Sequence, residues 1–212
     1  MSDPVQDRAA RAMGAAARAM GVQTHAFRPR GAHRPLAPEN RFLRLPAAMQ
    51  VGARFGRAAR TDAPLWQGVF DTAYTAQGDY LVQGESIFFI AAQPRLLAAT
   101  CVKTNRLVSI QRAGGAVAVG INPYGGATRT ELSDIMTEWP ASMLGVHAAG
   151  WPRAHLPADV AESGWTVLLP PIAAFQPRPG DLLRDDLGRA GAIGGMAETE
   201  FGWRLAVREA HA

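Results

Sequence analysis

The chain lacks most of the sequence features that identify enzymes and membrane proteins. It has one cysteine in 212 residues, which excludes an intrachain disulfide and a zinc site built from cysteines. No apolar run approaches the roughly 20 residues of a membrane helix. Asp3 and Asp7 lie among the first arginines without an apolar segment, so we expect no secretory signal. Neither a phosphate-binding GxxxxGK(S/T) loop nor a GxSxG nucleophile turn occurs, and the glycine-rich stretches predict turns and close strand packing.

Lysine is also nearly absent, and the arginines are unevenly distributed. Lys103 is the single lysine among 22 basic residues. Residues 1–60 carry 11 arginines and three acidic residues, a net charge of +8, whereas residues 61–212 carry 11 basic and 15 acidic residues, a net charge of −4. This division suggests an N-terminal arm that docks on an acidic partner or lies near nucleic acid. A GC-rich genome is the alternative explanation for the preference for arginine over lysine.

What the sequence does contain is a motif that occurs twice. Residues 78–92 read GDYLVQGESIFFIAA, and residues 180–193 read GDLLRDDLGRAGAI. Each copy has Gly-Asp, an apolar run, a polar turn and a second run, and one more strand-like stretch follows each. We expect two related three-stranded meanders in which Asp79 and Asp181 occupy equivalent turn positions and accept hydrogen bonds from nearby backbone amides.

The first quarter of the chain predicts a helix followed by an extended arm. Residues 4–20 have an apolar stripe of alanine and methionine at helical spacing, and Gly21 is a natural stop. Residues 27–47 contain four prolines and read as an irregular connector that lies along another surface. Aromatic and arginine side chains suited to an interface occur in this arm. Two later tryptophans, each followed by a proline, are expected to lie in loops and could also anchor an interface. The candidate interface residues are Phe27, Arg28, Arg30, Arg34, Phe42, Arg44, Trp139 and Trp151.

The expected fold class is mainly β with an N-terminal helix, made of small antiparallel β-barrel or meander modules and an extended arm. Residues 64–112 and 164–210 are expected to be antiparallel β structure, with a turn or two of helix near 130–145. The chain then divides into a helix and basic proline-rich arm at 1–63 and a β-rich domain at 64–212. The β-rich domain would hold both Gly-Asp modules and an intervening loop segment.

Few residues are candidates for chemistry, and each has a simpler structural interpretation. Cys101 lies in an apolar run and is expected to be a buried hydrophobic residue. His147 and His155 lie in a loop without a carboxylate at ligand spacing, and Asp185-Asp186 fall where a hairpin turn is expected. No residue is therefore assigned to catalysis, to a cofactor or to a metal.

The two Gly-Asp segments resemble parts of structural proteins of tailed bacteriophages. The segment at 180–210, GDLLRDDLGRAGAIGGMAETEFGWRLAVREA, is similar to small β-barrels that plug or extend the head–tail channel. The segment GDYLVQGESIFFIAAQPRLLAATCVKTNRLVSI resembles phage proteins of otherwise unassigned role, and NRFLRLPAAM extends the likeness into the arm. The second copy departs from the pattern, because it has AGAIGG where such barrels more often have bulky β-branched residues.

The resemblance implies a virion structural protein of the head–tail interface (a neck, adaptor or head-completion ring), assembled in the cytoplasm of a bacterial host. The expected partners are copies of itself in a ring and neighbouring portal, adaptor or tail proteins, with possible proximity to DNA in the channel and no membrane. A tail or baseplate protein is the alternative within this class. Outside the class, a β-rich hydrolase would have to pair Asp79 or Glu85 with Asp185, and a nucleic-acid-binding module would use the basic arm.

Overall fold

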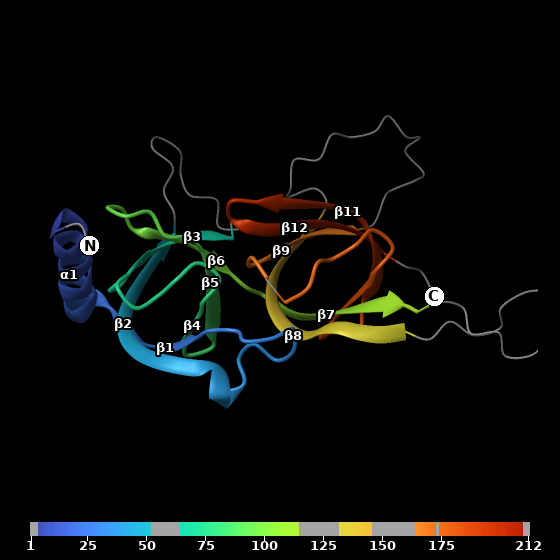
Figure 1. Cartoon of the computed structure of the whole chain (residues 1–212), viewed down its shortest axis with the longest axis horizontal. Helices are drawn as coiled ribbons and strands as arrows, with labels where there is room; N and C mark the ends of the chain where they lie inside the picture. The colour runs from blue at the N-terminus through green and yellow to red at the C-terminus, as the bar shows by residue number, and fades with distance from the viewer. Residues whose placement is uncertain (1–3, 52–63, 115–131, 146–163, 173, 210–212) are drawn as a thin grey trace, which may run out of the picture.

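A computed structural model describes residues 4–51, 64–114, 132–145, 164–172 and 174–209, and it contains one α-helix and twelve strands within these ranges (Figure 1). The helix α1 spans Pro4–Met20, and a short 3-10 helix, η1, spans Pro38–Asn40. The strands are β1 (Val22–Phe27), β2 (Arg41–Val51), β3 (Leu65–Val69), β4 (Tyr80–Gln83), β5 (Ser86–Ala92), β6 (Ala99–Lys103), β7 (Arg106–Ala113), β8 (Leu132–Gly145), β9 (Gly164–Leu169), β10 (Leu182–Asp185), β11 (Ala190–Thr199) and β12 (Gly202–Glu209).

The strands form two closed, antiparallel barrels that lie side by side, with α1 against the outer end of the first (Figure 1). The first barrel has the order β1-β2-β3-β6-β5-β4, and the second has the order β7-β8-β9-β12-β11-β10 around its ring. The two orders are the same when the strands are numbered within each barrel. The predicted fold class is therefore confirmed, and the repeat seen in the sequence belongs to a duplication of the whole barrel topology.

The two Gly-Asp turns are equivalent in detail, as the sequence predicted. Gly78 and Gly180 both have φ of +91°, a conformation that glycine adopts without strain. The amide of Gly78 donates to the carbonyl of Ile90 at 2.9 Å, and that of Gly180 donates to Ile193 at 2.8 Å. Each following aspartate then accepts the amide of the residue three positions before it at 2.8 Å. These bonds fix the start of β4 and of β10 in the same way.

An arginine closes each turn, and the sequence did not predict this part. Arg28 donates to both carboxylate oxygens of Asp79 at 2.8 and 2.7 Å, and Arg112 donates to both oxygens of Asp181 at 2.8 Å. Arg28 follows β1 directly and Arg112 lies near the end of β7, the equivalent strand. We call these pairs the first and the second Arg–Asp clasp.

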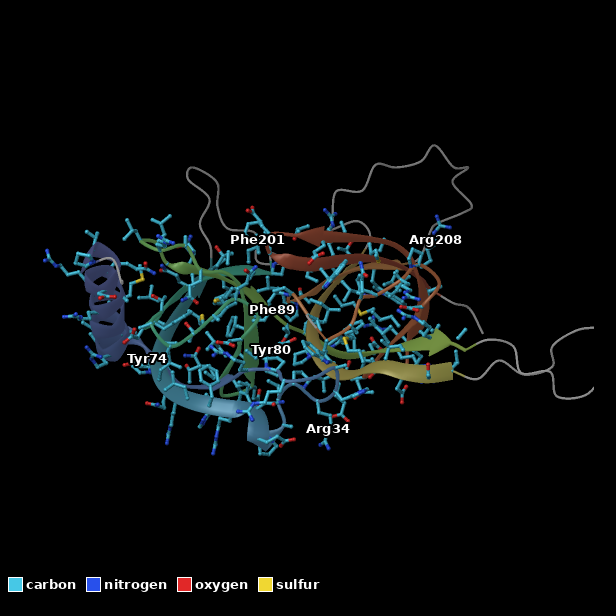
Figure 2. The ribbon with its side chains drawn as sticks, viewed as in Figure 1. Arg34, Tyr74, Tyr80, Phe89, Phe201 and Arg208 are labelled. Carbon is cyan, nitrogen blue, oxygen red and sulfur yellow. The ribbon has the colours of Figure 1, made fainter. Side chains whose placement is uncertain are left out.

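Part of the apolar core is common to the two barrels. One buried cluster belongs to the first barrel alone, while a larger one joins Tyr80 and Phe89 of the first barrel to the core of the second. The Tyr80 hydroxyl donates to the carbonyl of Pro140 at 2.8 Å, and the Tyr80 ring meets the ring of Trp139 edge-on at 6.0 Å between centroids. Figure 2 shows Tyr80 and Phe89 at the junction of the barrels. Because buried aromatic surface crosses the junction, the two barrels form one unit.

Two sequence predictions are wrong. The stretch at 27–47 is not an irregular connector throughout, because residues 41–47 belong to β2, one of the six strands of the first barrel. Residues 132–145 hold no turn of helix, because this segment is β8, which pairs with β7 and β9. The boundary between the two barrels falls at Thr104–Asn105, between β6 and β7.

The helix prediction is confirmed, and its small residues explain how it packs. Ala10, Gly14 and Ala17 are buried on the side of α1 that faces β2 and β3. A Cβ at Gly14 would lie 3.2 Å from the Cβ of Asp71, so the lack of a side chain lets the helix approach closely. This contact holds α1 on its own barrel through a narrow stripe.

Candidate interaction surfaces

A groove of about 570 Å³ lies where the two barrels meet. It is bordered by the connection that leaves β1, by the first Gly-Asp turn and by the segment that follows β9. Its lining residues are Arg28, Pro29, Arg30, Gly31, Ala76, Gln77, Gly78, Asp79, Trp139, Pro171, Ile172 and Ala174. Three of these, Arg28, Arg30 and Trp139, are predicted interface residues, and the two arginines are exposed.

The Arg28 guanidinium in this groove is held from several sides. Besides the clasp with Asp79, it donates to the Tyr74 carbonyl at 3.3 Å and lies over the Phe42 ring at 4.5 Å from the centroid. The hydrogen bonds to the Asp79 side chain raise the pKa of Arg28, against the opposing effect of burial. Arg28 is therefore a positioned, permanently charged group whose carboxylate partner lies within the chain.

The loop between β1 and η1 contacts the second barrel of its own chain. The Arg34 amide donates to the Thr137 carbonyl at 3.0 Å, and the Trp139 indole donates to the Ala32 carbonyl at 2.7 Å. The Arg34 guanidinium also pairs with Glu138 at 3.2 Å, between two exposed side chains. This part of the predicted arm therefore joins the two barrels within one chain.

The predicted interface residues consequently fall into different places. Phe27 packs partly buried against the shared core, and Trp139 is 1% exposed in β8, not in a loop as predicted. Trp139 therefore offers almost no surface to another chain. Arg30, Phe42 and Arg44 are exposed, whereas Trp151 lies outside the described residues. The structure thus leaves Arg28, Arg30, Arg34, Phe42 and Arg44 exposed.

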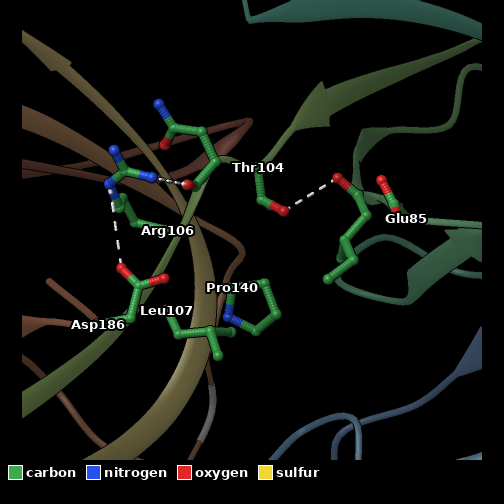
Figure 3. A pocket seen from close by; sticks show the side chains of 8 residues that line it. Glu85, Thr104, Arg106, Leu107, Pro140 and Asp186 are labelled. Atoms are coloured by element: carbon green, nitrogen blue, oxygen red, sulfur yellow. Dashed lines mark hydrogen bonds and ion pairs between the residues drawn. The ribbon is translucent and has the colours of Figure 1, made fainter.

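A second, smaller hollow of about 180 Å³ lies beside the connection between the barrels (Figure 3). Thr104 donates its hydroxyl to the Ile87 carbonyl at 3.0 Å, which ties the connection to the first barrel. On the other side, Arg106 approaches Asp186 to 4.0 Å, and Glu85 faces the same hollow. Glu85 and Asp186, which belong to the hairpin turns of the first and the second barrel, therefore border the same hollow.

Two of the carboxylates weighed for catalysis, Asp79 and Asp185, are bound by arginines of the chain. Asp79 is held by Arg28 on the groove, while Asp185 accepts two backbone amides and the Arg189 guanidinium at 2.7 Å. Burial would raise the pKa of Asp185, but the hydrogen bonds from Arg189 lower it overall. The turn interpretation of Asp185 is confirmed.

Cys101 is fully buried, and burial raises the pKa of its thiol to about 12. The prediction of a buried hydrophobic residue is confirmed. Within the described residues, no group of three histidine, cysteine or carboxylate side chains could hold a metal ion. His147 and His155 lie outside these residues.

A comparison of the chain with protein-family models, with curated proteins and with solved structures finds no match. In the described part of the chain, no helix has both the length and the apolar character needed to cross a membrane.

Proposed function

We propose that the chain is a virion structural protein, a subunit of a ring at the head–tail interface of a tailed bacteriophage. The phage resemblance of its two Gly-Asp segments is the starting point, and the duplicated barrel is the observation that carries the proposal furthest. Both resembling segments form hairpins of closed barrels with identical strand order, and a shared apolar cluster joins the barrels. A unit of two similar, joined barrels suits a part that is repeated around a ring.

The use of the polar side chains supports an assembly role over an enzymatic one. The buried carboxylates Asp79, Asp181 and Asp185 are each bound by an arginine of the chain, so their charge fixes turns. The thiol of Cys101 is held neutral by burial. On this proposal the protein binds no cofactor and is no enzyme. Its partners are copies of itself and the neighbouring portal, adaptor or tail proteins in the virion.

The direct experiment is to locate the protein in the particle. Particles would be purified from a host that produces the phage, and the chain would be detected by mass spectrometry and by gold-labelled antibody in electron microscopy. Label at the junction of head and tail supports the proposal, and label along or at the tip of the tail supports the tail or baseplate alternative. Absence of the chain from intact particles, with the portal protein detected as a control, would refute both.

A complementary experiment measures assembly in solution. The native mass of the purified protein would be compared with and without the portal or tail protein encoded next to it. A ring of defined copy number, alone or on the partner, is expected. A protein that stays monomeric in both samples contradicts the ring. Turnover of cell-wall glycans by the purified protein would instead favour the hydrolase.

A further inference from the structure

The solvent-facing side of α1 carries a row of arginines. Arg8, Arg11 and Arg18 are exposed, and their spacing of three and seven residues places them within an arc of about 80°, beside the face that buries Ala10, Gly14 and Ala17. Arg8 and Arg18 are about 15 Å apart along the helix axis at 1.5 Å per residue. The row is therefore rigidly displayed by a helix that is packed on the first barrel.

The adjoining strand extends this positive surface. α1 packs against β2, and β2 exposes Arg41 and Arg44. Within the described residues, no hydrogen bond or ion pair neutralises any of these five arginines, in contrast to Arg28 and Arg34. Residues 4–51 contain eight arginines and only two acidic residues, Asp7 and Glu39. We call Arg8, Arg11, Arg18, Arg41 and Arg44 the basic surface.

We propose that the basic surface binds the phosphate backbone of duplex DNA without reading its sequence. A duplex carries one negative charge per about 1.7 Å of its axis, so a 15 Å row of guanidinium groups has phosphates within reach along its whole length. Guanidinium groups also pair with phosphate through two parallel hydrogen bonds. Binding of this kind needs exposed, unpaired positive charge on a firm support, which α1 and β2 provide.

One feature of the surface favours duplex DNA over a single strand. Single-stranded nucleic acid is held by stacking of bases on exposed aromatic rings, whereas the outward side of α1 presents alanines between its arginines. A second copy of the chain is the competing partner, because its second barrel exposes Glu198 and Glu200, and a measurement of self-association separates it from DNA. The binding does not rest on the proposed virion role, so the two proposals can fail separately.

The test is a salt titration of the full chain against a mixed-sequence duplex of about 30 base pairs, followed by fluorescence anisotropy. Five phosphate contacts predict a slope of log K against log salt of about −4.5, which is a loss of about 500-fold in affinity between about 50 and 200 mM salt. The triple variant R8A/R11A/R18A retains two contacts, so its affinity should fall only about 12-fold over the same range and should be weaker at low salt.

The control variant is R95A/R178A/R184A, which removes three exposed arginines that are not part of the basic surface and changes the net charge equally. It should bind like the unchanged protein, and the lysine variant R8K/R11K/R18K should retain most of the binding. Circular dichroism and thermal melting would check that every variant is folded.

Several results would overturn the inference. One is no binding to the duplex at low salt, and another is equal loss in the two alanine variants, which would show that only net charge matters. Tighter binding to a single strand of the same length would also overturn it. A loss of self-association in R8A/R11A/R18A with unchanged DNA binding would assign the surface to a protein partner instead.

Discussion

Removing the carboxylate of the second Arg–Asp clasp should destabilise the protein more than removing that of the first. The two clasps have the same bond pattern, and their aspartates are almost equally buried, with side chains 3% exposed for Asp181 and 2% for Asp79. Their arginines differ, since the Arg112 side chain is 25% exposed and that of Arg28 is 48% exposed. A comparison of the two variants therefore shows how the solvent exposure of the arginine changes the contribution of such an ion pair to stability.

The expected magnitudes follow from these exposures. Loss of one partner from a buried ion pair costs about 3–5 kcal/mol, and an exposed pair contributes about 0.2–1 kcal/mol. Asp181→Ala should lower the free energy of unfolding by about 3 kcal/mol, because Arg112 is left largely out of water. Asp79→Ala should cost about 2 kcal/mol, because Arg28 keeps water and the Phe42 ring. Each variant also loses one acceptor for a backbone amide, so that contribution cancels in the comparison.

The assay is equilibrium unfolding in urea, followed by far-ultraviolet circular dichroism and tryptophan fluorescence. Asp79→Asn and Asp181→Asn serve as controls that keep an acceptor for the amide and remove only the charge. The reasoning is refuted if Asp79→Ala costs as much as Asp181→Ala, or if both cost less than about 0.5 kcal/mol, since solvent exposure would then not govern the clasps.

Three further predictions use other parts of the molecule. The Cys101 thiol should not react with a thiol reagent at pH 8 until the protein unfolds. Folding raises the pKa of this thiol to about 12, so the thiolate forms in the unfolded chain first. The free energy of unfolding should therefore fall as the pH rises from about 9 towards 12, as measured by unfolding at several pH values. Tyr80→Phe should lower stability by about 1–3 kcal/mol because it leaves the buried Pro140 carbonyl without its donor, and melting should remain a single transition because the barrels share a core. Deletion of residues 1–20 should leave both barrels folded, whereas deletion of 1–45 removes β1 and part of β2 and should abolish the β signal of the first barrel in circular dichroism; equal spectra for the two truncated proteins would contradict the barrel assignment.

The parts of the fold that could be predicted from the sequence are those with local signals. The helix at 4–20 has its apolar stripe and Gly21, and the hairpins at 78–92 and 180–193 have alternating runs around short turns with Gly84 and Gly188 at positive φ. The equivalence of the two Gly-Asp turns also follows from local residues. The arginines that close these turns lie 51 and 69 positions from their aspartates, so pairing them requires the barrel topology first.

The missed strands share a feature that explains the errors. Both β2 and β8 contain a proline, Pro46 and Pro140, and proline lacks the amide that a strand interior uses. In β8 the pairing with β7 is irregular around Val108 and Ile110, and Glu138 has φ of +55°, so the strand accommodates proline next to a bulge. Both segments form strands because they pair with, and are buried by, parts of the chain that are distant in sequence. The β propensity of the local residues does not contain this information.

Residues 4–51 form α1 and two strands of the first barrel in place of an irregular arm, and this changes how they could take part in assembly. An irregular arm would gain order only on a neighbour, and its binding would be weakened by the entropy lost in that step. The structure instead uses the inward residues of β2, such as Leu45 and Ala47, to build the first barrel, and it leaves Arg44 on the outside. The positive charge of the outward arginines is then already positioned, so binding a partner costs little conformational entropy in this segment. It follows that a partner of this segment, whether DNA or protein, recognises the surface of a folded barrel, and that substitutions of the outward arginines test that recognition without the loss of fold that a deletion brings.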